Sequence, residues 1–479
     1  NSTGFNNTAI GYNAGLSYNS ASYNTLVGAY AGNRIDNGEY TVHIGNEAGR
    51  YATGSSNTFV GANAGKGGTT SAPYSSGENN VAVGLSALAG FTSAEGNTAV
   101  GYNASMDVTT GGYNTSLGYR AGYNITSGGN NTAVGAYALF SSQTISYDTA
   151  IGFGALMDNT SNGSNVAIGW NAMTETTAAG SNVAVGYEAL KWGTHQKSIA
   201  IGYQAMADTN AGSTSMGSDD NIFIGYQAGG GTWADAASNY NVAIGNNAMD
   251  AALNGALYNM AMGYGALGAL TEGDGNVAIG HGAGSAITTG LNNITIGRGA
   301  GDSMTTNAGV IAIGYYAGED INNANGNYSV IIGHEAGGNM TSANPNHLMG
   351  YRSGYAITTG GNNVASGYET LRYNQTGYGN VAIGYHASQN ATSSLNVSVG
   401  FEAGRGKTSA PYNSGEANIS IGAYTNHTVS TGKRNVSIGT SAGYAMETGT
   451  DNTLLGNNAG YNVKHAEGAT IIGGYAGRY

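Results

Sequence analysis

The sequence has no cysteine, almost no proline and few charged residues. The absence of cysteine among 479 residues excludes disulfide bonds, thiol catalysis and zinc–thiolate sites. Only 9% of the residues are charged and only 3 are proline, which argues against a disordered chain. With 15 Lys and Arg and a net charge of −12, the chain lacks the basic surface that nucleic-acid binding requires. No apolar run approaches the roughly 18–20 residues of a membrane-spanning helix.

Glycine, in contrast, supplies 83 residues, and its spacing reveals an internal repeat. Segments such as Asn7-Thr-Ala-Ile-Gly11 and Asn97-Thr-Ala-Val-Gly101 recur 27 times when aligned on their last glycine, the anchor glycine. Of the 26 spacings between anchor glycines, seventeen are 17 residues, three are 16, and six run from 18 to 23. The array occupies residues 1–479 as one continuous domain. Because it starts at the first residue and still runs at the last, we expect a segment of a longer protein.

Positions are numbered here by their offset from the anchor glycine. Position −1 is Ile, Val, Leu or Met in 26 of 27 units, position +3 is Ala in 24, and position −4 is Asn in 21. Position −3 is mostly Thr, Val or Ile, and position −2 is Ala in 14 units. The alternation from −3 to −1 has the period of a β-strand. We expect positions −1 and +3 to fill a thin core and position −2 to point away from it, toward another chain.

A unit of 17 residues is too short for a strand–helix–strand crossover or a helical hairpin. Two short strands and two turns fit, with the second turn marked by glycines at position −7, where a positive φ is easiest. The sequence therefore predicts an all-β fold, a parallel β-solenoid of about 27 coils stacked about 4.8 Å apart. The asparagines of position −4 are expected to form a ladder, in which each amide bonds backbone at a corner and the next amide.

The pattern Asn-x-Ala-(Ile/Val)-Gly-x-x-Ala resembles the YadA-like head repeats of trimeric autotransporter adhesins, and similar repeats of phage tail fibres and bacterial surface fibres. The resemblance covers essentially the whole chain. It implies a left-handed β-roll, three chains side by side, and a location outside the cell. Two departures limit what it implies: this unit is longer than the family's usual one, and the neck, coiled-coil stalk and membrane anchor are absent.

Three inserts interrupt the regular spacing, near residues 65–79, 206–220 and 404–417. The first and the third share the motif Thr-Ser-Ala-Pro-Tyr-x-Ser-Gly-Glu, which indicates duplication of a larger block. Two interpretations remain open: loops that relieve coil strain or cover a neighbouring chain, and loops that contact a ligand. On the second interpretation, the ligand-contact residues are Pro73, Tyr74, Trp233, Pro411 and Tyr412.

Other candidate sites are few. Position +1 is aromatic in 14 of the 27 units, 11 of them Tyr, so that a column of rings could bind sugar faces or seal a corner or groove. The eight His are scattered, and we predict no catalytic site and no cofactor. Glu272, Asp274 and Asn276 place oxygens at alternate residues, as calcium loops do, but without the glycine and distal glutamate of an EF-hand. A solvated turn is the alternative.

These observations predict a non-enzymatic extracellular fibre or adhesin segment, which sets distance and presents a repeated binding surface to glycans or proteins of other cells. Self-association is expected, as a homotrimer or a larger homo-oligomer, with no nucleic acid as partner. The alternatives are a phage tail-fibre segment that binds a receptor, or an attachment or prey-capture filament. A less favoured alternative is a polysaccharide depolymerase, which would need a carboxylate pair in one groove; acidic pairs are few, and none, Asp219 and Asp220 included, is convincing.

Overall fold

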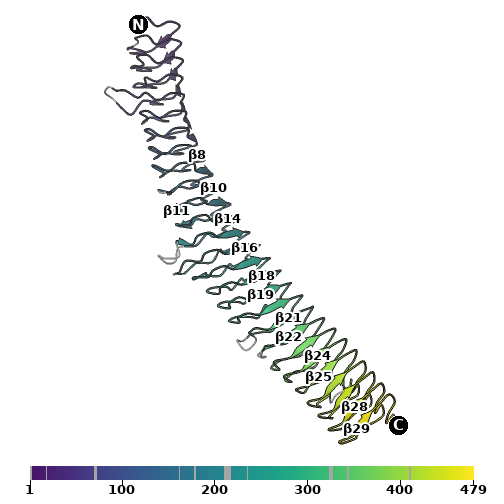
Figure 1. Ribbon diagram of the computed structural model, residues 1–479. Helices are drawn as coiled ribbons and strands as arrows, with labels where there is room; N and C mark the ends of the chain where they lie inside the picture. The colour runs from purple at the N-terminus through teal and green to yellow at the C-terminus, as the bar shows by residue number, and fades with distance from the viewer. Residues whose placement is uncertain are drawn as a thin grey trace. The chain divides into compact units, whose positions relative to one another are not determined.

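The computed structural model describes residues 3–17, 19–69, 73–160, 162–176, 180–209, 217–234, 236–322, 327–341, 345–408 and 412–478. These residues form an all-β parallel solenoid of about 26 turns with about 17 residues per turn, and they contain no α-helix. The predicted fold class and repeat length are therefore confirmed. The chain divides into two compact units, residues 1–241 and 242–479, and both are built from the same coil (Figure 1).

Each coil contributes one three-residue strand, which covers positions −3 to −1. In the first unit these are β1 (Thr8–Ile10), β2 (Thr25–Val27), β3 (Val42–Ile44), β4 (Thr58–Val60), β5 (Val81–Val83), β6 (Thr98–Val100), β7 (Thr115–Leu117), β8 (Thr132–Val134), β9 (Thr149–Ile151), β10 (Val166–Ile168), β12 (Val183–Val185), β14 (Ile199–Ile201) and β15 (Ile222–Ile224). In the second unit they are β16 (Val242–Ile244), β17 (Met260–Met262), β18 (Val277–Ile279), β19 (Ile294–Ile296), β20 (Ile311–Ile313), β21 (Val330–Ile332), β22 (His347–Met349), β23 (Val364–Ser366), β24 (Val381–Ile383), β25 (Val397–Val399), β26 (Ile419–Ile421), β27 (Val436–Ile438), β28 (Thr453–Leu455) and β29 (Thr470–Ile472).

Within each unit, every strand pairs in parallel with the strand of the next coil, without slippage. Ala150 of β9 pairs with Ala167 of β10, and Ala167 pairs with Ala184 of β12. Because the register is preserved, each sequence position becomes a straight column along the unit. Inserts leave the register intact: across the second insert, Ala200 of β14 still pairs with Phe223 of β15.

The expected second strand of the coil is mostly absent from the described residues. Only β11 (Glu175–Thr176) and β13 (Trp192–Gly193) form a second, two-stranded parallel sheet, beside a few isolated bridges. Backbone hydrogen bonds between coils nevertheless continue there, for example from Leu88 N to Ala104 O at 2.9 Å. Residues at positions −5, +2 and +4 adopt left-handed backbone conformations, as Leu88 does with φ of 51°. Such residues turn the chain and interrupt strand geometry while leaving inter-coil hydrogen bonds in place.

The core assignment made from the sequence is wrong for the strand. Position −2 points into the coil: Leu26, Phe59 and the alanines of this column from Ala82 onward are fully buried, whereas positions −3 and −1 lie on the outer face. The prediction ranked side chains by hydrophobicity and put the large aliphatic column inside. The alanines of position +3 are buried with this column, as expected, and large residues at position +7, such as Ile35 and Phe91, are fully buried as well.

Within this core, positions −2 and +4 are complementary. Where position −2 is large, position +4 is glycine: Leu26 faces Gly32, and a Cβ on Gly32 would lie 2.7 Å from the Leu26 side chain. Where position −2 is alanine, position +4 is often Leu or Met, as for Ala82 with Leu88. In these coils a large side chain comes from either position −2 or position +4, whereas coils such as that of Ala278 and Gly284 have a small residue at both.

The glycines of position −7 lie at a corner, as predicted, but for a different reason. None of Gly54, Gly111 and Gly128 has a positive φ. A Cβ at each of them would instead collide with a backbone carbonyl oxygen of the following coil. The close approach of successive coils, and not backbone torsion, requires glycine at this corner.

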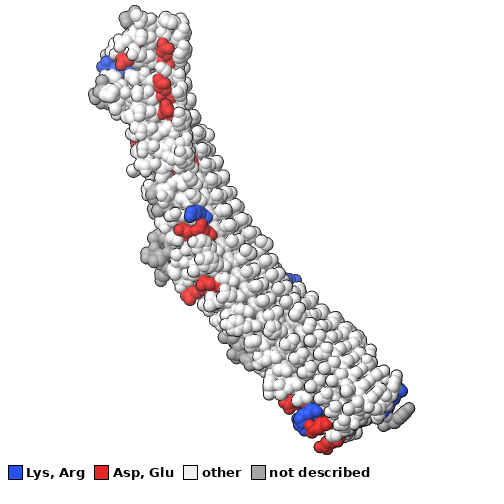
Figure 2. All heavy atoms as spheres, in the orientation of Figure 1, with Lys and Arg blue, Asp and Glu red and all other residues white. Residues whose placement is uncertain are grey.

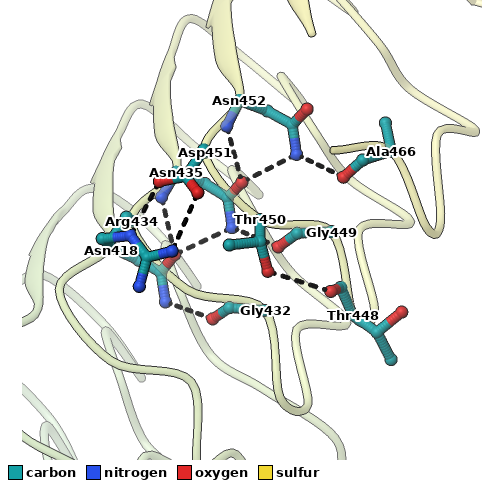
Figure 3. Close-up of polar contacts among 10 residues, drawn as sticks. All are labelled: Asn418, Gly432, Arg434, Asn435, Thr448, Gly449, Thr450, Asp451, Asn452 and Ala466. Carbon is teal, nitrogen blue, oxygen red and sulfur yellow. Dashed lines mark hydrogen bonds and ion pairs between the residues drawn. The ribbon is translucent and has the colours of Figure 1, made fainter. Parts of the chain in front are cut away.

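The asparagine ladder predicted for position −4 is present, and Figure 3 shows its C-terminal part. The Asn435 amide nitrogen donates to Gly449 O at 2.7 Å and to Asn418 Oδ1 at 3.0 Å. Asn435 Oδ1 accepts the backbone N–H and the amide N–H of Asn452, at 3.1 and 2.9 Å. All these groups are buried, so the ladder satisfies backbone polar groups that water cannot reach.

Asp148 replaces asparagine in this ladder and predicts a pH dependence of stability. Asp148 Oδ1 accepts from Asn165, but its buried Oδ2 has no hydrogen-bond partner, where the equivalent amide of Asn131 donates to Ile145 O. Burial raises the pKa of Asp148 to about 6, from 3.8. A raised pKa stabilises the fold below pH 3.8, and this stabilisation is lost as the pH rises through 6. The loss is about 3 kcal/mol at roughly 1.4 kcal/mol per pKa unit.

Asp148→Asn is therefore expected to raise the unfolding free energy at pH 7 by up to about 3 kcal/mol and to remove the loss between pH 4 and 6. Urea unfolding across this pH range measures the difference. Asp451→Asn is the matched control, because Asp451 is exposed and paired with Arg434. If Asp148→Asn raised the unfolding free energy equally at pH 4 and pH 7, titration of Asp148 between these pH values would be contradicted.

Candidate functional site

The outer face of the strands is mostly aliphatic, with threonine in about a third of the coils at position −3. Positions −3 and −1 contain no Lys, Arg, Asp or Glu in any of the 27 three-residue strands. Leu117 and Met349 at position −1 are 48% and 47% exposed. Figure 2 shows charged side chains only in separate small groups on the visible face. An exposed strand face without charge is unusual, because exposed sheet faces ordinarily carry polar residues.

A column of stacked aromatic rings follows the anchor glycines. In the first unit Trp170, Tyr187, Tyr203 and Tyr226 stack in sequence, with ring centroids 4.8, 4.9 and 5.3 Å apart and planes within 10° of parallel. Each ring face is covered by the next ring, so that solvent meets ring edges and phenol oxygens. Binding of sugars through ring faces is therefore disfavoured along the column, because that mode needs a free face.

Alternating charges form a third column in the second unit, at position +2. Glu335, Arg352, Glu369, His386 and Glu402 occupy successive coils. Arg352 Nε lies 2.5 Å from a Glu335 oxygen, and His386 lies between Glu369 and Glu402, at 3.4 and 3.7 Å. Reading this position alone along the sequence would have revealed the alternation, which the sequence analysis missed.

The pKa shifts in this column are those of carboxylates paired with basic side chains. Burial acts to raise the pKa of Glu402, but the hydrogen bond from His427 at 2.8 Å and the charge of Arg405 lower it overall. Burial, reinforced by Arg405, lowers the pKa of His386. A depressed carboxylate pKa is the opposite of what a general acid requires. The column fits a structural role that links coils.

The first and third inserts place their tyrosines alike. Tyr74 stacks on Tyr51 at 6.2 Å, with Arg34 over its ring, and Tyr412 stacks on Tyr373 at 5.1 Å. Both tyrosines therefore pack against earlier coils of their own chain. Pro73 and Tyr74 also line a surface pocket of about 370 Å³ with Asp36, Asn37, Thr53 and Ser76.

The remaining candidates of the inserts lie elsewhere. Trp233 is buried in the core, where its indole N–H donates to Gly229 O at 3.0 Å and its ring packs on Phe223. The expectation that Trp233 contacts a ligand is therefore wrong: the aromatic fills the core. Pro411 lies outside the described residues. A second pocket, of about 270 Å³, adjoins the third insert and is lined by Gly406, Lys407, Thr408, His427, Thr428 and Glu447.

The calcium candidates do not converge. Glu272 accepts from Asn254 at 2.9 Å, and Asp274 accepts the backbone N–H of Leu257 at 2.7 Å. Asn276 belongs to the buried ladder, where its oxygen accepts from Asn293. Among the described ranges, no group of three or more His, Asp or Glu side chains is arranged to hold a metal ion.

The two aspartates considered for polysaccharide cleavage both contact the backbone of Gln196, one through its carboxylate and one through its backbone N–H. Asp219 Oδ1 accepts the backbone N–H of Gln196 at 2.7 Å, and burial raises the pKa of Asp219. The backbone N–H of Asp220 donates to Gln196 O at 3.0 Å, so both residues serve to hold the base of the second insert.

Comparison with known proteins finds no family model, no curated protein and no solved structure that matches this chain. Within the part of the chain that the structure describes, no helix is long and apolar enough to cross a membrane.

Proposed function

We propose that this chain is a segment of an extracellular, non-enzymatic fibre, which acts as a spacer and as a repeated surface for attachment to other cells or surfaces. The observation that carries the proposal is the uniform coil, whose charge-free outer face recurs at every turn in register, with aromatic rings stacked in part of the array. Such columns repeat one weak contact many times, which suits multivalent attachment. The resemblance to YadA-like head repeats supports the same role.

The charge-free outer face is the surface through which identical chains associate in this proposal, as a trimer of left-handed β-rolls. Aliphatic side chains at positions −3 and −1 would lose their solvent contact on association, with a gain of about 25 cal/mol per Å² buried. The earlier expectation assigned the contact to the alanines of position −2, and those side chains are buried inside the coil.

Lysine on the outer face is expected to dissociate the assembly without unfolding the coil. Val166→Lys with Val183→Lys adds two charges to neighbouring strands, where burial of an unpaired charge is costly. Light scattering should report a mass reduced to that of one chain, and circular dichroism should report retained β-structure.

The matched control is Ser164→Lys with Ser181→Lys, two exposed residues in the same coils at position −5. This control variant is expected to keep the full assembly mass. An equal loss of mass in both variants, or in neither, would remove the outer face as the contact. Glutamate at Ala150, Ala167 and Ala184 is instead expected to unfold the coils, because all three alanines are buried.

Attachment itself is tested by binding of labelled protein to cells before and after periodate treatment, which destroys glycans. Loss of binding after periodate identifies a glycan partner, and loss after protease identifies a protein partner. Release of reducing ends from polysaccharide, abolished by Asp219→Asn with Asp220→Asn, would instead establish a depolymerase and overturn the proposed function.

A further inference from the structure

Tyrosine pairs stacked in register occur in both units. In the first unit, the rings of Tyr187 and Tyr203 lie 4.9 Å apart and 7° from parallel, and those of Tyr203 and Tyr226 lie 5.3 Å apart and 10° from parallel. Tyr102 and Tyr119 form a similar pair at 5.2 Å. In the second unit the ring centroids of Tyr351, Tyr368 and Tyr385 follow one another at 5.0 and 5.2 Å.

These rings are accessible as well as paired. Tyr187, Tyr203 and Tyr226 are 39%, 43% and 47% exposed, so that a small oxidant reaches each ring edge. Parallel planes at such centroid distances mean an offset stack, in which neighbouring ring edges overlap. The in-register backbone holds every pair in the same arrangement, since each ring occupies the same position of successive coils.

We propose that this column is an oxidative modification site, at which a peroxidase with hydrogen peroxide couples neighbouring tyrosines into dityrosine. Each phenol loses one electron and its hydroxyl proton and becomes a tyrosyl radical. Two radicals form a carbon–carbon bond between carbons ortho to the oxygens, and each ortho hydrogen then moves to its phenol oxygen as the ring regains aromaticity. The two electrons and two protons reduce one hydrogen peroxide to two waters.

Coupling within the column is favoured over coupling between molecules because the two partners are already adjacent. Fixing two reactants at contact distance replaces a bimolecular encounter by an intramolecular step. The product joins coils that are 16 to 23 residues apart in sequence, as Tyr187–Tyr203 and Tyr203–Tyr226 are. This product is a covalent cross-link between coils in a chain that has no cysteine for disulfide bonds. The proposal does not depend on how many chains associate.

The test treats the full chain at low concentration with peroxidase and hydrogen peroxide, and maps linked peptides by mass spectrometry. The expected result is dityrosine between Tyr187 and Tyr203, Tyr203 and Tyr226, and Tyr102 and Tyr119, with a yield per molecule that does not change on dilution. Tyr187→Phe with Tyr203→Phe should abolish the first two links and leave the link between Tyr102 and Tyr119 unchanged.

The matched control removes two tyrosines that are more exposed, Tyr147 at 66% and Tyr328 at 69%, neither of which stacks on another ring among the described residues. Tyr147→Phe with Tyr328→Phe is expected to leave every link in place. Links that follow exposure rather than stacking, a yield that falls on dilution, or an absence of dityrosine would each overturn the proposal.

Discussion

Replacing Phe59 with alanine is expected to lower the unfolding free energy by about 3–5 kcal/mol, and adding Gly65→Leu to that variant is expected to restore most of the loss. Phe59 is fully buried and its ring packs on His43 at 4.9 Å and on Phe91 at 5.6 Å. Truncation leaves a cavity between two walls of the coil. Gly65 lies on the facing wall, where a Cβ would be 2.5 Å from the Phe59 ring.

The reason for the rescue is the complementarity of positions −2 and +4. Gly65→Leu alone places the leucine against the Phe59 ring. Because overpacking a core costs about 1–3 kcal/mol, this single variant is expected to lower the unfolding free energy by at least that amount. With alanine at 59, the same leucine reproduces the pair found at Ala82 and Leu88. Leucine also tolerates the backbone there, because Gly65 has φ of 52° and Leu88 has φ of 51°.

Urea unfolding of the two single variants and the double variant gives a double-mutant cycle, in which the coupling should exceed about 2 kcal/mol. The control combines Phe59→Ala with Gly49→Leu, one coil away, where the leucine meets His43 and fills no cavity. If the free-energy changes of the two single variants simply added, or if the control restored stability equally, positions −2 and +4 would not be complementary.

Asn435→Ala is expected to cost about 2–6 kcal/mol, since it leaves two buried groups without a partner at about 1–3 kcal/mol each. Gly449 O loses its donor and the backbone N–H of Asn452 loses its acceptor, whereas Asn418 Oδ1 keeps the backbone N–H of residue 435. Amide hydrogen exchange should accelerate most at Asn452, because its N–H then faces no acceptor.

The matched variant is Asn435→Ser, which is expected to cost less than half as much. Serine occupies this position naturally at Ser198 and Ser329, where the hydroxyl accepts the next backbone N–H from Asn221 and from Asn346. Equal destabilisation by alanine and serine would mean that the ladder contributes through packing and not through hydrogen bonds.

The spacing of one residue type predicted the fold, because a column is visible in sequence wherever a single chemistry recurs. Asparagine at position −4 predicted the ladder, and the 17-residue period predicted coils in register. The orientation of the strand was not predictable from composition alone. By hydrophobicity alone, Ala167 is expected at the surface and Ile168 in the core. In the structure Ala167 is buried and Ile168 is exposed. Comparing positions −2 and +4 within each unit would have corrected this, since a large residue at −2 accompanies glycine at +4.

The positions of the candidate site residues were predictable from the sequence only in part. Tyr74 and Tyr412 stack on rings of earlier coils, a contact that their shared motif did not predict. Trp233 was read as a loop residue because its neighbourhood in sequence is irregular, whereas the coil core takes the ring. Glu272 and Asp274 looked like calcium ligands only by spacing. In the structure both side chains accept hydrogen bonds from neighbouring coils. Such contacts cannot be read from spacing along the sequence.

The most direct test of self-association through the charge-free outer face is the mass of the purified full chain in solution, measured by light scattering. The account predicts a single species with the mass of three chains, one chain being 48.1 kDa. A stable, folded monomer at every concentration would contradict it, because the aliphatic columns of positions −3 and −1 would then face water along every coil.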